Sequence, residues 1–228
     1  MRFLPFIIVA ALVISGCVAS QTGTGQGDTV GQSTATKLTA CGDVTSDSVL
    51  DADLVTTSRC FNIKKSGVTL DCQGHSITTS GLADYPAVYA EKVENVKISD
   101  CVINGFGFGV SFDSVNSSEI RGNTVTGARN RGVRLYNSVG ITVDNNKISG
   151  AKFDGIYLYY SDNAVVANND ASRNAGGFYS EGSQGATVSN NRFCGNIDYD
   201  AKCDPAVSGT GNTLDTPYCG KLEASKDC

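Results

Sequence analysis

Several residue types that proteins use to bind metals or nucleic acids are scarce in this sequence. The 228 residues include one histidine, one methionine and no tryptophan, and no Cys-x-x-Cys pair occurs. With a single histidine and no closely spaced cysteine pair, the sequence does not favour a zinc or copper site. The 18 lysines and arginines are outnumbered by 23 acidic residues and form no cluster, whereas phosphate binding needs concentrated positive charge. We expect no metal cofactor and no nucleic-acid partner.

A long hydrophobic run occurs only near the N-terminus, from Phe3 to Ile14 after the basic Arg2. This layout is typical of a secretory signal and is too short for a membrane-spanning helix with both flanks. The run ends in Ile14-Ser15-Gly16-Cys17, which resembles the lipobox of prokaryotic lipoproteins. That resemblance implies a signal peptide over residues 1–16 and a lipidated mature N-terminus at Cys17. The alternative is an ordinary signal peptide followed by an incidental cysteine.

The segment that follows, residues 17–36, is rich in glycine, serine, threonine and glutamine and has no apolar periodicity. Such a composition is typical of a flexible tether. Residues 37–228 then form the predicted folded domain. We expect it outside the cytoplasm, at the cell surface or in the periplasm, held to the membrane only by the lipid anchor.

One pattern recurs every 22 or 23 residues between positions 96 and 194. Its first apolar positions are Ile98, Ile120, Val143, Val166 and Val188, and its second are Ile103, Val125, Ile148, Ala171 and Phe193. A glycine opens a third strand-like segment at Gly109, Gly132, Gly155 and Gly177. A fixed period of this length is typical of a solenoid, in which each repeat buries its apolar side against its neighbours. The pattern predicts an all-β fold of stacked coils with three short strands per coil.

A family resemblance supports this fold. The segment Val68 to Ile77 (VTLDCQGHSI) and the later Asn-Asn pairs resemble secreted right-handed parallel β-helix proteins of the pectin-lyase-like superfamily, over residues 41 to 215. The resemblance implies a single-stranded right-handed parallel β-helix of about seven coils. The superfamily includes lyases, hydrolases, epimerases, adhesins and non-enzymatic surface proteins, so the resemblance implies a fold and not a function. Asn145, Asn168 and Asn190 occupy the same turn position in successive coils and are expected to form a hydrogen-bonded amide ladder.

Eight cysteines remain besides Cys17, and an even number behind a secretory signal predicts disulfides. Proximity pairs Cys41 with Cys60 in the entry coil and Cys72 with Cys101 between neighbouring coils. The other four, whose pairing the sequence leaves open, would fasten a C-terminal cap: Cys194, Cys203, Cys219 and Cys228. His75 lies in the turn of the entry motif, where a turn hydrogen bond is favoured over an acid–base role. Asp198, Asp200 and Asp204 are expected to form a solvated loop rather than a calcium site.

Five of the nine tyrosines fall on the outward positions of the third strand of each coil. The first outward column is Tyr89, Ser111, Arg134, Tyr157 and Tyr179, and the second is Glu91, Asp113, Tyr136, Tyr159 and Glu181. The outward positions of the first strand hold no aromatic residue. We call this surface the tyrosine wall and expect it to be exposed and nearly flat. Its predicted ligand-binding residues are Tyr89, Arg134, Tyr136, Tyr157, Tyr159, Tyr179 and Glu181.

Three functions fit this surface. The preferred one is polysaccharide binding, with aromatic rings on sugar faces and charged groups on hydroxyls. The second is a small polysaccharide lyase or glycoside hydrolase: Glu91 and Asp113 would act as paired carboxylates, or would hold calcium while Arg134 serves as base, as the resemblance implies. The third is an adhesion or spacer module, in which the tyrosines only form and stack along strands. No catalytic motif of the family is present, which favours binding over catalysis.

Overall fold

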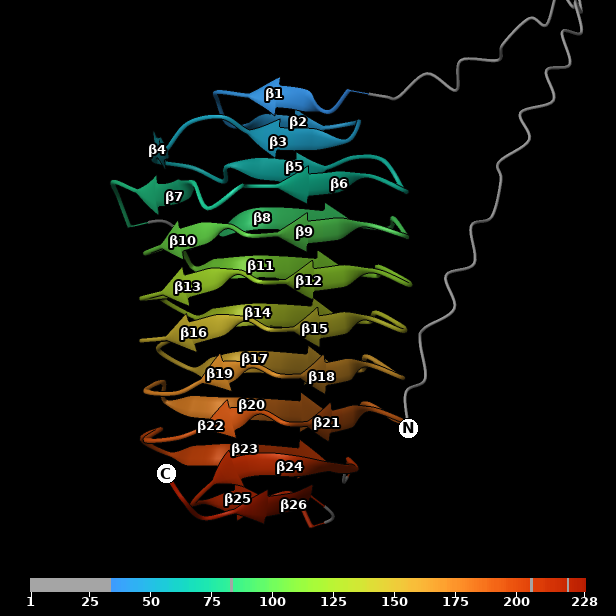
Figure 1. The fold of residues 1–228 in the computed structure, drawn as a ribbon, viewed down its shortest axis with the longest axis vertical. Helices are drawn as coiled ribbons and strands as arrows, with labels where there is room; N and C mark the ends of the chain where they lie inside the picture. Colours follow the sequence, from blue (N-terminus) through green and yellow to red (C-terminus); the bar gives the residue numbers. More distant parts are fainter. Residues whose placement is uncertain (1–33, 83, 206, 221) are drawn as a thin grey trace, which may run out of the picture. The chain divides into compact units, whose positions relative to one another are not determined.

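The computed structural model describes residues 34–82, 84–205, 207–220 and 222–228. The described residues form strands and no helix, so they contain no helical segment able to cross a bilayer. The predicted signal peptide, the lipidation site Cys17 and most of the tether lie outside the described residues. Figure 1 shows the strands as stacked layers from β1 to β26.

The strands belong to three parallel sheets, one for each side of a coil. The first sheet contains β1 (Thr36–Leu38), β3 (Ser48–Leu50), β6 (Thr69–Asp71), β9 (Lys97–Ser99), β12 (Glu119–Arg121), β15 (Thr142–Asp144), β18 (Val165–Ala167) and β21 (Thr187–Ser189). The second contains β4 (Leu54–Thr56), β7 (Ser76–Thr79), β10 (Val102–Asn104), β13 (Thr124–Thr126), β16 (Lys147–Ser149), β19 (Asp170–Ala171), β22 (Arg192–Phe193), β24 (Gly209–Leu214) and β26 (Leu222–Ser225).

The third sheet contains β2 (Gly42–Val44), β5 (Phe61–Ile63), β8 (Pro86–Glu91), β11 (Phe108–Asp113), β14 (Arg131–Tyr136), β17 (Asp154–Tyr159), β20 (Gly176–Glu181), β23 (Tyr199–Asp204) and β25 (Pro217–Tyr218). The chain visits first, second and third sheet in turn, which gives seven complete coils from β3–β4–β5 to β21–β22–β23. Partial coils flank them at both ends. The predicted parallel solenoid of about seven coils is confirmed.

Repeated inward positions build the core. Both predicted first-sheet and second-sheet columns are buried, from Ile98 to Val188 and from Ile103 to Phe193. A third column comes from the third sheet and consists of Val88, Val110, Val133, Ile156 and Phe178. Because apolar side chains at one position of every coil touch the equivalent side chains above and below, the period in the sequence becomes a continuous core.

The asparagine ladder lies one residue further along the chain than predicted. Asn145, Asn168 and Asn190 have left-handed backbones, with φ of 54°, 57° and 57°, and expose their side chains. The left-handed residue turns the corner, and the next residue then faces inward. The ladder is therefore formed by the buried asparagines Asn123, Asn146, Asn169, Asn191 and Asn212.

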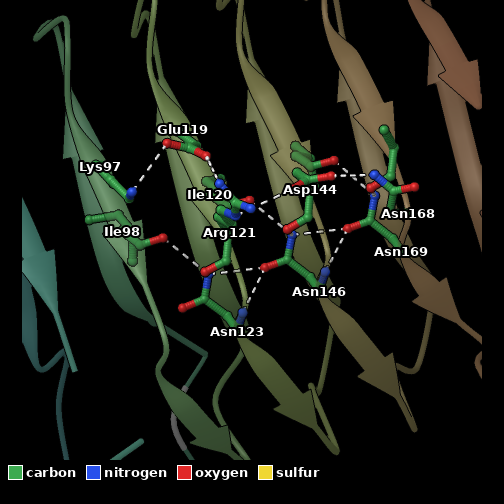
Figure 2. Close-up of polar contacts among 12 residues, drawn as sticks. Lys97, Ile98, Glu119, Ile120, Arg121, Asn123, Asp144, Asn146, Asn168 and Asn169 are labelled. Carbon is green, nitrogen blue, oxygen red and sulfur yellow. Dashed lines mark hydrogen bonds and ion pairs between the residues drawn. The ribbon is translucent and has the colours of Figure 1, made fainter. Parts of the chain in front are cut away.

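Each ladder amide joins two neighbouring coils (Figure 2). The Asn146 backbone N–H donates to Asn169 Oδ1 at 2.9 Å, and Asn146 Nδ2 donates to the Ile120 carbonyl at 2.9 Å. At the corner, buried backbone N–H and C=O groups have no partner in the sheets. The asparagine side chains bond to these groups, which would be unfavourable if left unpaired. The same column continues towards the N-terminus as Cys101, whose N–H donates to Asn123 Oδ1 at 3.0 Å.

Four disulfides lie near the two ends of the stack, as predicted. Near the N-terminal end they join Cys41 to Cys60 and Cys72 to Cys101, the two pairings suggested by proximity. At the C-terminal end they join Cys194 to Cys228 and Cys203 to Cys219. Three of them fasten the terminal coils, whereas Cys72–Cys101 joins the coils that contain β6 and β9, one step further into the stack.

The expectation of a solvated acidic loop is wrong for Asp200. This residue is buried, and its carboxylate accepts hydrogen bonds from Asn196 Nδ2 at 2.9 Å and from the backbone N–H of Asp215 at 2.8 Å. It therefore holds the last coil together. Asp198 and Asp204 are exposed, as expected, although Asp204 lies at the end of strand β23 and not in a loop.

Candidate functional site: the tyrosine wall

The predicted outward columns are in register on the third sheet. Strand pairing places Ser111 between Tyr89 and Arg134, and continues through Tyr157 and Tyr179. The second column runs likewise from Glu91 and Asp113 through Tyr136 and Tyr159 to Glu181. The two columns lengthen into β23 as Lys202 and Asp204.

The rings of the wall stack on one another along the solenoid. Tyr136 and Tyr159 have ring centroids 4.8 Å apart and are inclined by only 11°. Tyr157 and Tyr179 lie 5.3 Å apart and are tilted by 46°. Contacts of this kind cover ring faces that would otherwise be open to solvent.

Cationic side chains cover further ring faces. Four tyrosines each have one within cation–π distance: Arg59 lies 4.2 Å from Tyr89, Arg134 4.5 Å from Tyr136, Arg131 3.9 Å from Tyr157 and Lys202 4.7 Å from Tyr179. The expected open aromatic surface is therefore wrong in one respect. Tyr157 is only 7% exposed, and Tyr89, Tyr136, Tyr159 and Tyr179 are half-buried, because they are covered by each other and by these cations.

A third outward column, at the start of the third-sheet strands, supports the wall. Asp154 is buried, accepts a hydrogen bond from Arg131 Nε at 2.8 Å and receives the Tyr199 hydroxyl. Gly176 lies between them, where a Cβ would come within 2.5 Å of the Tyr199 ring. Arg131 thus bridges a buried carboxylate and the ring of Tyr157. The sequence pattern does not reveal this column, because its residues differ from coil to coil and share no property.

The hydroxyls of Tyr157 and Tyr199 stay protonated well above neutral pH. The Tyr157 hydroxyl donates to Glu181 Oε2 at 2.6 Å, and burial followed by this bond raises its pKa. Burial, followed by the hydrogen bond to Asp154, raises the pKa of Tyr199 in the same way. These phenols are hydrogen-bonding groups at neutral pH and not bases.

The three candidate catalytic residues lie close together but are occupied by other partners. Glu91 and Asp113 are partners in the register of β8 and β11. Glu91 forms an ion pair with Lys92 at 3.1 Å, which lowers the pKa of its carboxyl, and Asp113 accepts a hydrogen bond from the Ser114 hydroxyl at 3.0 Å. Arg134 donates to the Ser111 hydroxyl at 3.1 Å.

In two other candidate sites, the side-chain atoms that could bind a metal or transfer a proton already have partners within the protein. His75 donates its backbone N–H to the Cys72 carbonyl at 2.8 Å, and its Nδ1 lies 3.4 Å from Asp53 Oδ1. Within the described ranges, the cluster of potential metal ligands consists of Asp200, Asp215 and Cys228. The Cys228 sulfur is bonded to Cys194 and Asp200 accepts backbone hydrogen bonds, so this cluster is structural.

Tyr160 is a further aromatic residue beside the wall that the alternation of the strands did not predict. It follows β17 at the corner between the third and first sheets, and its ring meets Tyr159 edge-on at 4.6 Å. The signal in the sequence was the pair Tyr159-Tyr160, at a place where the preceding coil has Tyr136-Asn137.

Comparison with known proteins identifies the family. Residues 30–214 match the family model described as "Periplasmic copper-binding protein (NosD)". The chain belongs to the NosD family. No curated protein sequence gives a significant match. Like the disulfides, the description of the NosD family as periplasmic agrees with a location outside the cytoplasm.

Solved structures share the fold of this NosD-family chain. They include the Dettilon tailspike protein, with 12% identity over 73% of this chain and a TM-score of 0.52. A double mutant of the periplasmic alginate epimerase AlgG has 19% identity over 79% and a TM-score of 0.53. An alginate lyase from Paenibacillus sp. str. FPU-7 has 14% identity over 83% and a TM-score of 0.52. The chain covers 43% of the tailspike, 48% of the epimerase and 86% of the lyase.

The donor set of this NosD-family chain does not fit the copper named in the family description. Protein copper sites use imidazole, thiolate and thioether ligands. The sequence has one histidine, and His75 stands alone beside Asp53. All eight cysteines of the described residues are in disulfides, and the single methionine, Met1, lies outside them. We assign no step of the function to copper.

Proposed function

We propose that this NosD-family chain is an extracytoplasmic lipoprotein that binds a polysaccharide along its tyrosine wall. The observation that carries the proposal is the concentration of tyrosines, each fixed by a cation or a neighbouring ring, on the third sheet. The fold neighbours support it, since an alginate epimerase and an alginate lyase share this fold. Lipid attachment at Cys17 rests on the lipobox-like sequence. Mass spectrometry of the mature N-terminus tests it, and cleavage elsewhere with a free Cys17 would contradict it.

The wall offers sugar hydroxyls a row of fixed polar groups. It carries tyrosine hydroxyls, a guanidinium group and carboxylates, and their positions are set by the ring stacks, cation–π contacts and hydrogen bonds described above. Groups held in place before binding lose little conformational entropy on binding. A polymer contacts many such groups at once, so weak individual contacts add up.

The experiment is affinity electrophoresis of the full-length chain through gels containing sodium alginate or dextran. We expect at least one polysaccharide to retard the wild-type chain. Arg134→Ala should weaken retention at least tenfold, because a hydrogen bond from a charged group contributes about 1.5–3 kcal/mol. If neither polysaccharide retards the chain and a glycan array also shows no binding, the proposal is overturned. An adhesion or spacer module is then favoured.

Arg121→Ala is the matched control. Arg121 is an arginine of the first sheet, exposed and within 4 Å of Glu119 and Asp144 (Figure 2). Its removal takes away the same charge from a face that carries no aromatic residue in its outward columns. We expect retention equal to wild type, and an equal loss in both variants would mean non-specific charge binding.

The register of Glu91 with Asp113 favours one alternative, a small polysaccharide lyase or glycoside hydrolase. Such an enzyme would release new chain ends from the retained polysaccharide. Asp113→Asn would then abolish release while leaving retention in the gel unchanged. A chelator would weaken retention if the two carboxylates share calcium.

A further inference from the structure

Tyr160 has an unusual backbone for a large side chain. Its φ is 43°, in the left-handed region that glycine and asparagine tolerate best and that is strained for bulky residues. The equivalent corner position of the preceding coil is Asn137, with φ of 47°, and that of the next coil is Gly182, with φ of 65°. Two residue types suited to this conformation therefore flank one that is not. Strain of this kind often marks a functional position.

The fold leaves room for this ring. A Cβ on Gly182 would lie 2.7 Å from Tyr160 Cε1, so only glycine in the next coil lets the ring lie against the backbone. Tyr159 meets it edge-on, with an angle of 85° between the rings. Tyr160 is nevertheless 56% exposed, whereas Tyr157 of the same coil is 7% exposed.

An uncovered ring face is what the central tyrosines lack. The faces of Tyr136, Tyr157 and Tyr179 are occupied by neighbouring rings and by cations. Among the described residues, no cation lies over Tyr160. The apolar C–H face of a pyranose ring needs such an open aromatic face to stack on.

We infer that Tyr160 is the stacking platform of the wall, on which one pyranose ring of the bound polysaccharide lies. The inference rests on the proposed function. It gives Tyr160 a different role from the tyrosines of the wall that stack on one another. Tyr160 contributes the apolar contact. The stacked tyrosines contribute hydroxyls and hold the arginines in place, so that sugars on either side of the stacked one are held by hydrogen bonds.

The absence of tryptophan from the sequence allows a direct test. Tyr160→Trp in the full-length chain introduces a single indole at the proposed contact. Titration with the polysaccharide that retards the wild type, sodium alginate or dextran, should shift the indole fluorescence emission to the blue. The dissociation constant obtained from this shift should equal the one obtained from the gel. The control is Val165→Trp, at a 42% exposed position on the outward side of β18 in the first sheet, whose emission should not change.

A second set of variants separates contact from strain. Tyr160→Asn introduces the residue type found at this corner in the preceding coil, so it should not lower the Tm. It should weaken polysaccharide binding about tenfold or more, as removal of a stacked aromatic side chain does. Tyr160→Phe keeps the ring face and should keep the affinity. If the wild type is retained but Tyr160→Asn binds equally well, the inference is overturned and the proposed function stands. If the wild type binds no polysaccharide, both are overturned.

Discussion

At the scale of single residues, the wall combines buried phenols with buried or half-buried charges. Tyr157 and Tyr199 each donate to a carboxylate, and both pKa values are raised in the folded state above the ordinary value near 10. The stabilisation from the neutral phenols is fully present below about pH 10, the unfolded value. It is lost as the pH rises from there towards the higher folded pKa, because only the unfolded chain has then released its protons.

We therefore expect the free energy of unfolding to fall above about pH 10. Urea denaturation at a series of alkaline pH values measures it. Tyr199→Phe should be less stable at neutral pH, since it leaves the buried Asp154 without one donor, and should lose less on going to high pH. Tyr218→Phe, which removes a 65% exposed hydroxyl, should show the wild-type profile. An identical alkaline loss in Tyr199→Phe would assign the effect to other groups.

At the scale of the corner element, neighbouring asparagines have opposite roles. Asn146 is buried and bonds to both adjacent coils, whereas Asn145 is exposed and supplies the left-handed turn. Asn146→Ala should destabilise the protein by about 2–4 kcal/mol, because buried N–H and C=O groups of two coils lose their partners. Asn145→Gly should change stability by no more than about 0.5 kcal/mol, since glycine accepts the same φ. Urea unfolding of both variants checks the contrast, and comparable losses would contradict it.

The same corner shows how far the sequence predicts this fold. The 22–23-residue period identifies the inward columns, because every coil repeats the same apolar requirement at the same place. The predicted position of the asparagine ladder was wrong by one residue, because strand alternation does not indicate where the backbone becomes left-handed. The cover over the tyrosine faces was missed for a related reason. Arg59 and Arg131 lie outside the two aligned columns, and their positions depend on corners and rotamers rather than on the period.

At the scale of the whole stack, each coil contacts only the coils above and below it. Stability in such an array is close to a sum of coil terms and nearest-neighbour terms, so the terminal coils are the ones most ready to open. The disulfides near the ends oppose this opening. The Cys41–Cys60 bond spans 19 residues and the Cys203–Cys219 bond spans 16, and loops of this size correspond to about 3 kcal/mol of stabilisation each.

Replacing Cys41 and Cys60 together by alanine should therefore act locally. Hydrogen exchange should accelerate in β1 to β5, which contain or adjoin the lost bond, and stay slow in β14 and β17, several coils away. Replacing Cys203 and Cys219 should accelerate exchange in β23 to β26 instead. Polysaccharide retention should survive the first change, because the rings of Tyr136, Tyr159 and Tyr160 lie in central coils that keep both neighbours. Uniformly faster exchange throughout the stack in either variant would mean that the coils unfold as one cooperative unit, and that the disulfides stabilise the whole domain rather than its ends.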